Sequence, residues 1–342
     1  MRRNTIVLAV LLAALAGYWW FYERGKNPAE SKDKLFAFKA EDAIGVALDY
    51  QGRAIVLQKD AQTHKWKLAA PLQAPGDDAA VGGLLTTLSS AAIKRTLDKK
   101  PSEADLKNFG LAPPNVKVSV TLKSGLTLPN LTVGTKTPLG DSTYAQRSND
   151  ATVYLADGSL GDALAHEPDD FRDRAILPFP SEPVARLEIN MGGKSIVVAR
   201  NEQEQWTLQA PSQGAASPDK VNGFIVQLAQ LRARSFIDNQ SDLKKYGLDK
   251  PALHIVLGAK GGRQLAALDA GQSGNAYFAR RDGDPTIFPI DEGSYKSLFR
   301  EESDFKAEEK KQEEKKAEEK KAEEKKDEIK VGEEKKPATK KP

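Results

Sequence analysis

Residues 105–114 of the chain read DLKNFGLAPP, and residues 242–251 read DLKKYGLDKP. Asp, Leu, Lys, an aromatic residue, Gly, Leu and Pro occupy the same seven offsets in both stretches. One copy of this pattern would be an ordinary loop. A second copy in the same chain indicates that a larger unit is written twice.

The first stretch has the features of a short helix that stops at a glycine. Ser102 is followed three residues later by Asp105, which is a helix-start pattern. Gly110 suits the left-handed conformation that ends a helix. Leu106 and Leu111 would then form the hydrophobic contact of a Schellman motif.

The second stretch repeats these roles with Leu243, Gly247 and Leu248. Pro114 and Pro251 prevent the helix from continuing, because proline has no backbone N–H and restricts the residue before it. We therefore predict that the motif is a stop-and-turn device that the chain uses twice.

Two tryptophans also stand at matching places. Trp66 and Trp206 each open an expected strand that ends at Pro71 or Pro211, in the pattern Trp-x-Leu-x-x-Pro. Alternating apolar positions flank each tryptophan, so we predict that both are core anchors rather than exposed ligand platforms.

The segments around these motifs follow one order in both copies. Alternating runs at 44–59 and 184–200, joined by short Gly-containing turns, predict a hairpin before each tryptophan. Apolar residues with helical spacing at 77–88 and 217–231 predict one amphipathic helix after it. The later strands match in four pairs: 116–122 with 253–257, 126–134 with 263–271, 143–147 with 276–280, and 152–156 with 286–290.

The predicted fold class is therefore α+β, with two tandem repeats of a mainly antiparallel sheet covered by one helix each. An N-terminal transmembrane helix precedes the repeats and a charged C-terminal tail follows them. The expected parts are a signal anchor, a linker, a first repeat, a second repeat and a Lys/Glu-rich low-complexity tail, at residues 1–25, 26–40, 41–176, 177–305 and 306–342.

The apolar run TIVLAVLLAALAGYWWFY at 5–22 predicts the membrane anchor. As a helix it would span about 26 Å, close to the thickness of a hydrocarbon core. The arginines before it and the aromatic cluster at its end suit the two interfaces, with the basic end in the cytoplasm. Cleavage after Ala14-Leu15-Ala16 is the alternative, but the apolar run continues past that site, so we favour a retained anchor. Either reading places the bulk of the chain outside the cytoplasm, on the periplasmic side of a bacterial inner membrane.

Composition excludes several classes of function. The chain has no cysteine, so it has no disulfide framework and no thiolate metal site. Between the anchor and the tail, acidic and basic residues almost balance, which is not the footprint of a nucleic-acid-binding protein. The tail from residue 306 has a Glu-Glu-Lys-Lys period without an apolar stripe, so it predicts a solvated helix or disorder rather than a coiled coil.

Residues able to carry chemistry are few. His64, His166 and His254 have no ligand spacing, so we expect solvated or structural roles for them. No phosphate loop, nucleophile elbow or dinucleotide fingerprint is present in the sequence. We therefore predict no catalytic residue, no cofactor and no metal ligand, and hence a protein that is not an enzyme.

Two local patterns resemble catalytic or ligand-binding sites. Asp169, Asp170 and Asp173 lie among arginines, and the alternating signs favour mutual neutralisation over a carboxylate pair. The second pattern is an aromatic followed three residues later by an arginine, at Tyr144–Arg147 and Tyr277–Arg280. Side chains at i and i+3 of a strand face opposite sides, so these pairs favour strand packing over twin binding sites.

The Trp-x-Leu-x-x-Pro element, the capped helix after it and the aromatic-Gly-Leu-x-x-Pro turn together resemble the bacterial DUF4340 family. The resemblance covers most of residues 40–300 and suggests two tandem copies behind one anchor. It implies no catalytic residues. It implies an accessory role in the envelope, because members are often encoded beside ABC-type transport systems related to gliding-motility machinery.

The leading functional hypothesis is a membrane-tethered, non-enzymatic adaptor that binds a protein or polymer of the envelope, as an accessory subunit of an ABC-type transporter. The first alternative is an exported hydrolase with an inter-repeat carboxylate site at Asp169, Asp170 or Asp173. The second alternative is a structural spacer whose charged tail reaches across the envelope.

Overall fold

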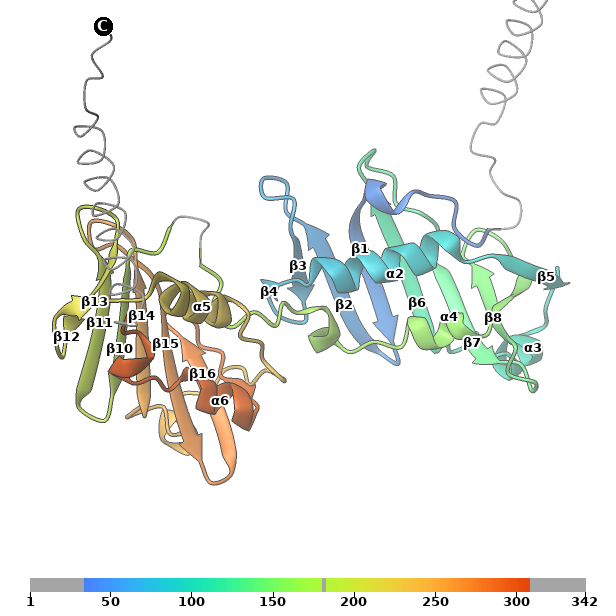
Figure 1. Ribbon diagram of the computed structural model, residues 1–342. Coiled ribbons are helices and arrows are strands. Elements are labelled where there is room, and N and C mark those ends of the chain that lie inside the picture. The colour runs from blue at the N-terminus through green and yellow to red at the C-terminus, as the bar shows by residue number, and fades with distance from the viewer. Residues whose placement is uncertain (1–33, 180–182, 308–342) are drawn as a thin grey trace, which may run out of the picture. The chain divides into compact units, whose positions relative to one another are not determined.

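The computed structural model describes residues 34–179 and 183–307, which form two compact units (Figure 1). The division falls between Asp173 and Arg174, whereas the sequence places it after residue 176. The expected anchor and nearly all of the charged tail lie outside the described residues. Among the described residues, no helix has the length and apolar character needed to cross a membrane.

Unit 1 is built on a nine-stranded sheet in which all neighbouring strands run antiparallel. In spatial order the strands are β4 (Ala74–Pro75), β3 (Trp66–Ala70), β2 (Arg53–Lys59), β1 (Ala43–Tyr50), β6 (Val116–Leu122), β7 (Leu131–Lys136), β8 (Ser142–Arg147), β9 (Val153–Asp157) and β5 (Ile93–Asp98). Its helices are η1 (Ala40–Asp42), α2 (Asp78–Ser90), α3 (Glu103–Asn108), α4 (Ser159–Ala163) and η2 (Pro168–Phe171).

Unit 2 has an eight-stranded antiparallel sheet. In spatial order the strands are β13 (Gly214–Ala215), β12 (Trp206–Ala210), β11 (Lys194–Arg200), β10 (Arg186–Met191), β14 (Leu253–Gly258), β15 (Gln264–Ser273), β16 (Ala276–Arg281) and β17 (Phe288–Ile290). Its helices are α5 (Pro218–Ala229), η3 (Leu243–Tyr246), α6 (Glu292–Leu298) and η4 (Glu302–Asp304).

The two units share one topology, because β13, β12, β11, β10 and β14 to β17 take the places of β4, β3, β2, β1 and β6 to β9. Both open with a tight hairpin whose two turn residues have positive φ. These residues are Gln51-Gly52 and Gly192-Gly193, as a type I′ turn requires. An α+β fold of two mainly antiparallel sheets with few helices is therefore confirmed.

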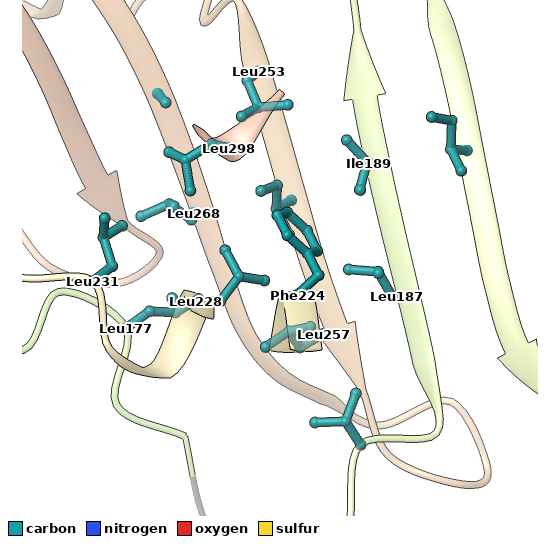
Figure 2. Packing of buried hydrophobic residues seen from close by; sticks show 14 of the residues in the cluster. Leu177, Leu187, Ile189, Phe224, Leu228, Leu231, Leu253, Leu257, Leu268 and Leu298 are labelled. Atoms are coloured by element: carbon teal, nitrogen blue, oxygen red, sulfur yellow. The ribbon is translucent and has the colours of Figure 1, made fainter. Parts of the chain in front are cut away.

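One long helix covers one face of each sheet. Asp77 caps the N-terminus of helix α2, because its carboxylate accepts hydrogen bonds from two backbone N–H groups, and the helix lies across the sheet (Figure 1). Figure 2 shows Phe224 and Leu228 of α5 directed into the core of unit 2, among side chains such as Leu187 of β10 and Leu257 of β14. The spacing of the buried residues along each helix is that of one apolar face.

The core of unit 1 begins before residue 41. Leu35 and Phe36 are buried in it, and the Leu35 backbone N donates to the Ala91 carbonyl at 2.9 Å. Ile176 makes the matching bond to Leu231 in unit 2, at 3.1 Å. Part of the segment that the sequence assigns to a linker, 26–40, thus belongs to the packed repeat.

The edge strand β5 was not expected from the sequence, and unit 2 has only a remnant of it. β5 pairs with β9, and Pro289 stands in β17 where Leu155 stands in β9. A proline cannot donate a ladder hydrogen bond. The remnant is limited to the bond from Arg234 N to the Pro289 carbonyl and a bridge between Ile237 and Ile287.

The strand pairing corrects the expected match of 143–147 with 276–280. Arg147 pairs with the first residue of β7, and Arg281 pairs with the matching leucine of β15. Arg147 also bonds Asp150 and Arg281 bonds Asp284, each within the turn that follows the strand. Arg147 therefore corresponds to Arg281, not to Arg280, and the expected match is one residue out of register. The sequence match was made on the tyrosine and arginine that TYAQR and AYFAR share at the same offsets, although a one-residue shift places every side chain of a strand on the other face.

We expect Phe224→Ala to destabilise unit 2 by roughly 3–5 kcal/mol, because it leaves a cavity in the core. Val226→Ala is the matched control on the same helix, since the Val226 side chain is 53% exposed, and should change stability by no more than about 0.5 kcal/mol. Hydrogen exchange of the full chain, resolved by peptide, measures both effects and uses unit 1 as an internal reference. Equal effects of the two variants would contradict this account of the core.

Asp284 should make the stability of unit 2 depend on pH. Burial opposes ionisation of this carboxyl, but hydrogen bonds from Thr286 and the charge of Arg281 outweigh burial and lower the pKa of Asp284. Because the folded state holds the lower pKa, the stabilisation is fully present above the unfolded pKa of about 3.9 and is lost as pH falls below it. In Asp284→Asn, the unfolding free energy of unit 2 should fall less steeply in acid than in the parent. A parental slope in Asp284→Asn would contradict this stabilisation.

Candidate functional site

The first repeated stretch forms a helix end with the hydrogen bonds of a Schellman motif. Ser102 and Asp105 close a capping box at the start of α3. Gly110 has φ +67°, and its N–H donates to the Lys107 carbonyl at 3.0 Å. The Leu111 N–H reaches back to the Leu106 carbonyl at 2.8 Å. Two of the orphan carbonyls at the helix end are thereby satisfied.

The second stretch makes the same bonds around a tighter helix. Gly247 also has φ +67° and donates to Lys244 at 3.1 Å, while Leu248 N donates to the Leu243 carbonyl at 3.0 Å. The preceding element is the 3-10 helix η3 instead of an α-helix. The turn geometry is retained although the helix before it differs.

Each turn presses against the backbone of a neighbouring strand. In unit 1, Thr135 N of β7 donates to the Phe109 carbonyl at 2.9 Å, and a Cβ on Gly134 would lie 2.0 Å from that oxygen. In unit 2, a Cβ on Gly271 of β15 would lie 2.2 Å from the Gly247 carbonyl oxygen. Only glycine fits at Gly134 and Gly271, because nothing but backbone lies opposite.

The aromatic residue of the motif packs on the next strand of the sheet. Phe109 stacks on Tyr144 with ring centroids 4.4 Å apart, and Tyr246 meets Phe278 edge to face at 5.0 Å. Ala279, next to Phe278, points into the main core. Since neighbouring residues in a strand face opposite sides, the turn motif covers the sheet face opposite α5.

The tryptophan strands have a structural role as well. Trp66 and Trp206 are buried in the two main cores, and Pro71 and Pro211 directly follow β3 and β12. The Trp206 ring nitrogen donates to the Asn222 side chain at 3.2 Å. These signature residues thus contribute to the packing of the fold.

The aromatic residue and the arginine of each predicted pair contact different partners. Arg147 donates to the Tyr154 hydroxyl and to Asp150, whereas Tyr144 packs on the turn motif. In unit 2, Tyr277 packs on Tyr295, whereas Arg280 donates to Asp269.

The acidic segment is engaged locally. Asp169 accepts a hydrogen bond from Arg172 at 3.2 Å, and Asp170 accepts from the Glu167 backbone N at 2.8 Å. His166 lies 3.3 Å from Asp170. Within residues 34–179 and 183–307, no group of three or more His, Cys, Asp or Glu side chains could hold a metal ion.

A cluster that the sequence analysis did not assemble lies on the sheet of unit 2. We call it the polar face. Asn190, His254, Asp269 and Arg280 stand side by side in register on β10, β14, β15 and β16. Two further members lie on β10, so the polar face consists of Arg186, Glu188, Asn190, His254, Asp269 and Arg280.

The side chains of the polar face hold one another in place. His254 Nδ1 lies 2.8 Å from Asp269 Oδ1, and Arg280 donates to the other oxygen of Asp269 at 3.4 Å. Hydrogen bonds from Asn190 and Arg186 lower the pKa of Glu188 below its ordinary value. Asp269 is 18% exposed while its partner His254 is 42% exposed, so the carboxylate is the fixed centre of the network and the imidazole its outer part.

The fold does not require this network. The matching row of unit 1, in the same register on β1, β6, β7 and β8, is Asp49, Lys117, Thr132 and Gln146. Ala47 stands where unit 2 has Glu188. The same sheet face thus carries an ionic network in one unit and lacks it in the other.

The polar face was missed because its members come from four strands spread over about a hundred residues, and no short motif connects them. The available signal was His254, for which we expected a solvated or structural role. The glycines at 134 and 271 had a clearer signal, since both end matched strand segments in the sequence.

Comparison with known proteins identifies one family. Its model, described as Domain of unknown function (DUF4340), matches residues 66–251 and 206–342. The two matches begin at Trp66 and Trp206, the first residues of the equivalent strands β3 and β12. No curated protein and no solved structure matches the chain.

We expect Gly271→Ala to destabilise unit 2 by about 3 kcal/mol or more, because the added methyl group overlaps a backbone carbonyl that cannot move alone. Gly223→Ala is the matched control in the same unit. Its Cβ would meet nothing within 4 Å, so in helix α5 it should stabilise by roughly 0.5–1 kcal/mol. Denaturant unfolding of the two variants measures the difference, and a tolerated Gly271→Ala would contradict the close approach of turn and strand.

Proposed function

Because the chain belongs to the DUF4340 family, a domain of unknown function, we propose a function from its own geometry and sequence. It is a non-enzymatic adaptor of the cell envelope, tethered by its N-terminal segment to the bacterial inner membrane with both units on the periplasmic side. Its partner is a protein, such as a subunit of an ABC-type transport system, and the polar face of unit 2 is the surface that binds it.

The observation that carries the proposal is the contrast between the two sheets. A solvent-facing side of an antiparallel sheet is normally polar, so exposed polar residues alone would mean little. The network of Glu188, Asp269 and Arg280 has no counterpart at Ala47, Thr132 and Gln146 of unit 1. Because unit 1 adopts the same fold without this network, we infer that the network of unit 2 has a functional role.

The network also suits recognition by a protein. Its charges are fixed by hydrogen bonds before any partner arrives, so binding orders few additional side chains. Both signs are present, which favours a partner with complementary charges in a defined register. Tethering both proteins to one membrane raises the effective concentration of the partner.

The alternatives have less support. Of the three carboxylates of the hydrolase hypothesis, Asp169 is engaged with Arg172 and Asp170 with the capping of η2, and Asp173 also has a partner. Those local roles leave the hydrolase without a supporting observation. The structural-spacer hypothesis depends on the charged tail, nearly all of which lies outside the described residues. If that hypothesis holds, deletion of 306–342 should abolish function without unfolding the units.

Gentle crosslinking in native membranes, followed by purification of the full chain, should recover a transporter subunit. The double variant Asp269→Ala, Arg280→Ala should reduce that recovery at least about fivefold, as expected when a buried interface contact worth about 1 kcal/mol is lost. The matched control is Thr132→Ala, Gln146→Ala at the equivalent positions of unit 1, which should leave recovery unchanged.

Hydrogen exchange of both variants checks that the sheets remain folded. Recovery of no membrane protein would contradict the adaptor function. Equal recovery with both double variants would contradict the assignment to the polar face.

A further inference from the structure

The outer edge of the sheet in unit 1 is strongly basic. β5 is the last strand of that sheet, and among the described residues it pairs with β9 alone. Lys94 and Arg95 within the strand and Lys99 and Lys100 after it are exposed. We call these four residues the basic edge.

Nearby acids neutralise only part of the basic edge. Lys94 lies 2.9 Å from Asp157, while Arg95, Lys99 and Lys100 make no ion pair with another residue of the described chain. Asp98 is bound by the backbone N–H of Lys100 at 2.9 Å. Three basic side chains therefore extend into solvent on one short segment.

Unit 2 does not repeat this arrangement. Residues 92–100 carry four basic side chains and one acidic, whereas 232–240 carry two basic and one acidic. Ala233, Asn239 and Gln240 occupy the corresponding stretch, and the strand itself is reduced because of Pro289. The basic edge is a property of the unit nearer the N-terminus.

The chain enters unit 1 directly beside the basic edge. Lys34 forms a β-bridge with Ala92, immediately before β5, and Leu35 N donates to Ala91. The apolar run that we assign to the membrane ends at Tyr22. The intervening residues can span at most roughly 40 Å when fully extended, so the basic edge cannot lie far from the bilayer.

We propose that the basic edge binds the anionic phospholipid headgroups of the membrane in which the chain is anchored. This inference rests on the proposed membrane tether. Each basic side chain close to an anionic bilayer strengthens association roughly fivefold, and this attraction acts within about 10 Å at moderate salt. The contact would hold unit 1 with β5 toward the membrane.

The absence of cysteine from the sequence allows a direct test in the full chain. Thr96→Cys places a fluorophore within the basic edge, and Ser235→Cys places one in the corresponding segment of unit 2; both positions are exposed. The labelled chains are reconstituted in nanodiscs of phosphatidylcholine, with or without an equal amount of phosphatidylglycerol, that contain headgroup-attached quencher. We expect quenching at position 96 to exceed that at position 235 at least about twofold in the anionic nanodiscs, and high salt to abolish the difference.

Charge variants distinguish an effect of the basic edge from an effect of the net charge of the chain. Lys99→Glu with Lys100→Glu should abolish the excess quenching, whereas Lys244→Glu with Lys245→Glu, an equal change of charge in unit 2, should leave it intact. Equal quenching at positions 96 and 235 would contradict the contact between the basic edge and the headgroups, and so would equal quenching in neutral and anionic nanodiscs. Neither result would contradict the N-terminal membrane tether. A chain that does not remain with the nanodiscs would overturn the tether and the contact together.

Discussion

The close approach of a helix-ending turn to the backbone of a strand is the constraint on which both units depend. The turn needs a left-handed glycine, at Gly110 or Gly247, and the strand beneath it needs a residue without a side chain, at Gly134 or Gly271. The turn covers the sheet face opposite the long helix, and the chain leaves it directly into the central strand β6 or β14. A local stop signal thus sets where the second half of each sheet begins.

The repeat, the fold class and the turn could be predicted from sequence because each depends on local spacing. A glycine after a capped helix, or apolar residues at helical intervals, specify their structure within a few positions. The register of β8 and β16, the strand β5 and the polar face could not be predicted, because they depend on partners far away in the chain. His254 meets Asp269 only after two strands have paired, and Pro289 removes a strand whose own sequence lies some fifty residues earlier.

Duplication supplies an internal reference for function. Positions that agree between the units, such as Trp66 and Trp206, serve packing that both copies need. Positions that differ carry the specialised surfaces, with the basic edge in unit 1 and the polar face in unit 2. In the function proposed here, one copy faces the lipid and the other faces a protein, so the two sheets divide the tasks of attachment and recognition.

Each unit is formed from one uninterrupted stretch of chain, and the last pairing of unit 1 joins Gly76 to Arg172 just before the division. Every partner that the first sheet requires has therefore been synthesised before unit 2 begins. A chain that is synthesised in the N-to-C direction can complete its first half while the second is still being made, which shortens the time that unpaired strands are exposed to proteases and to one another.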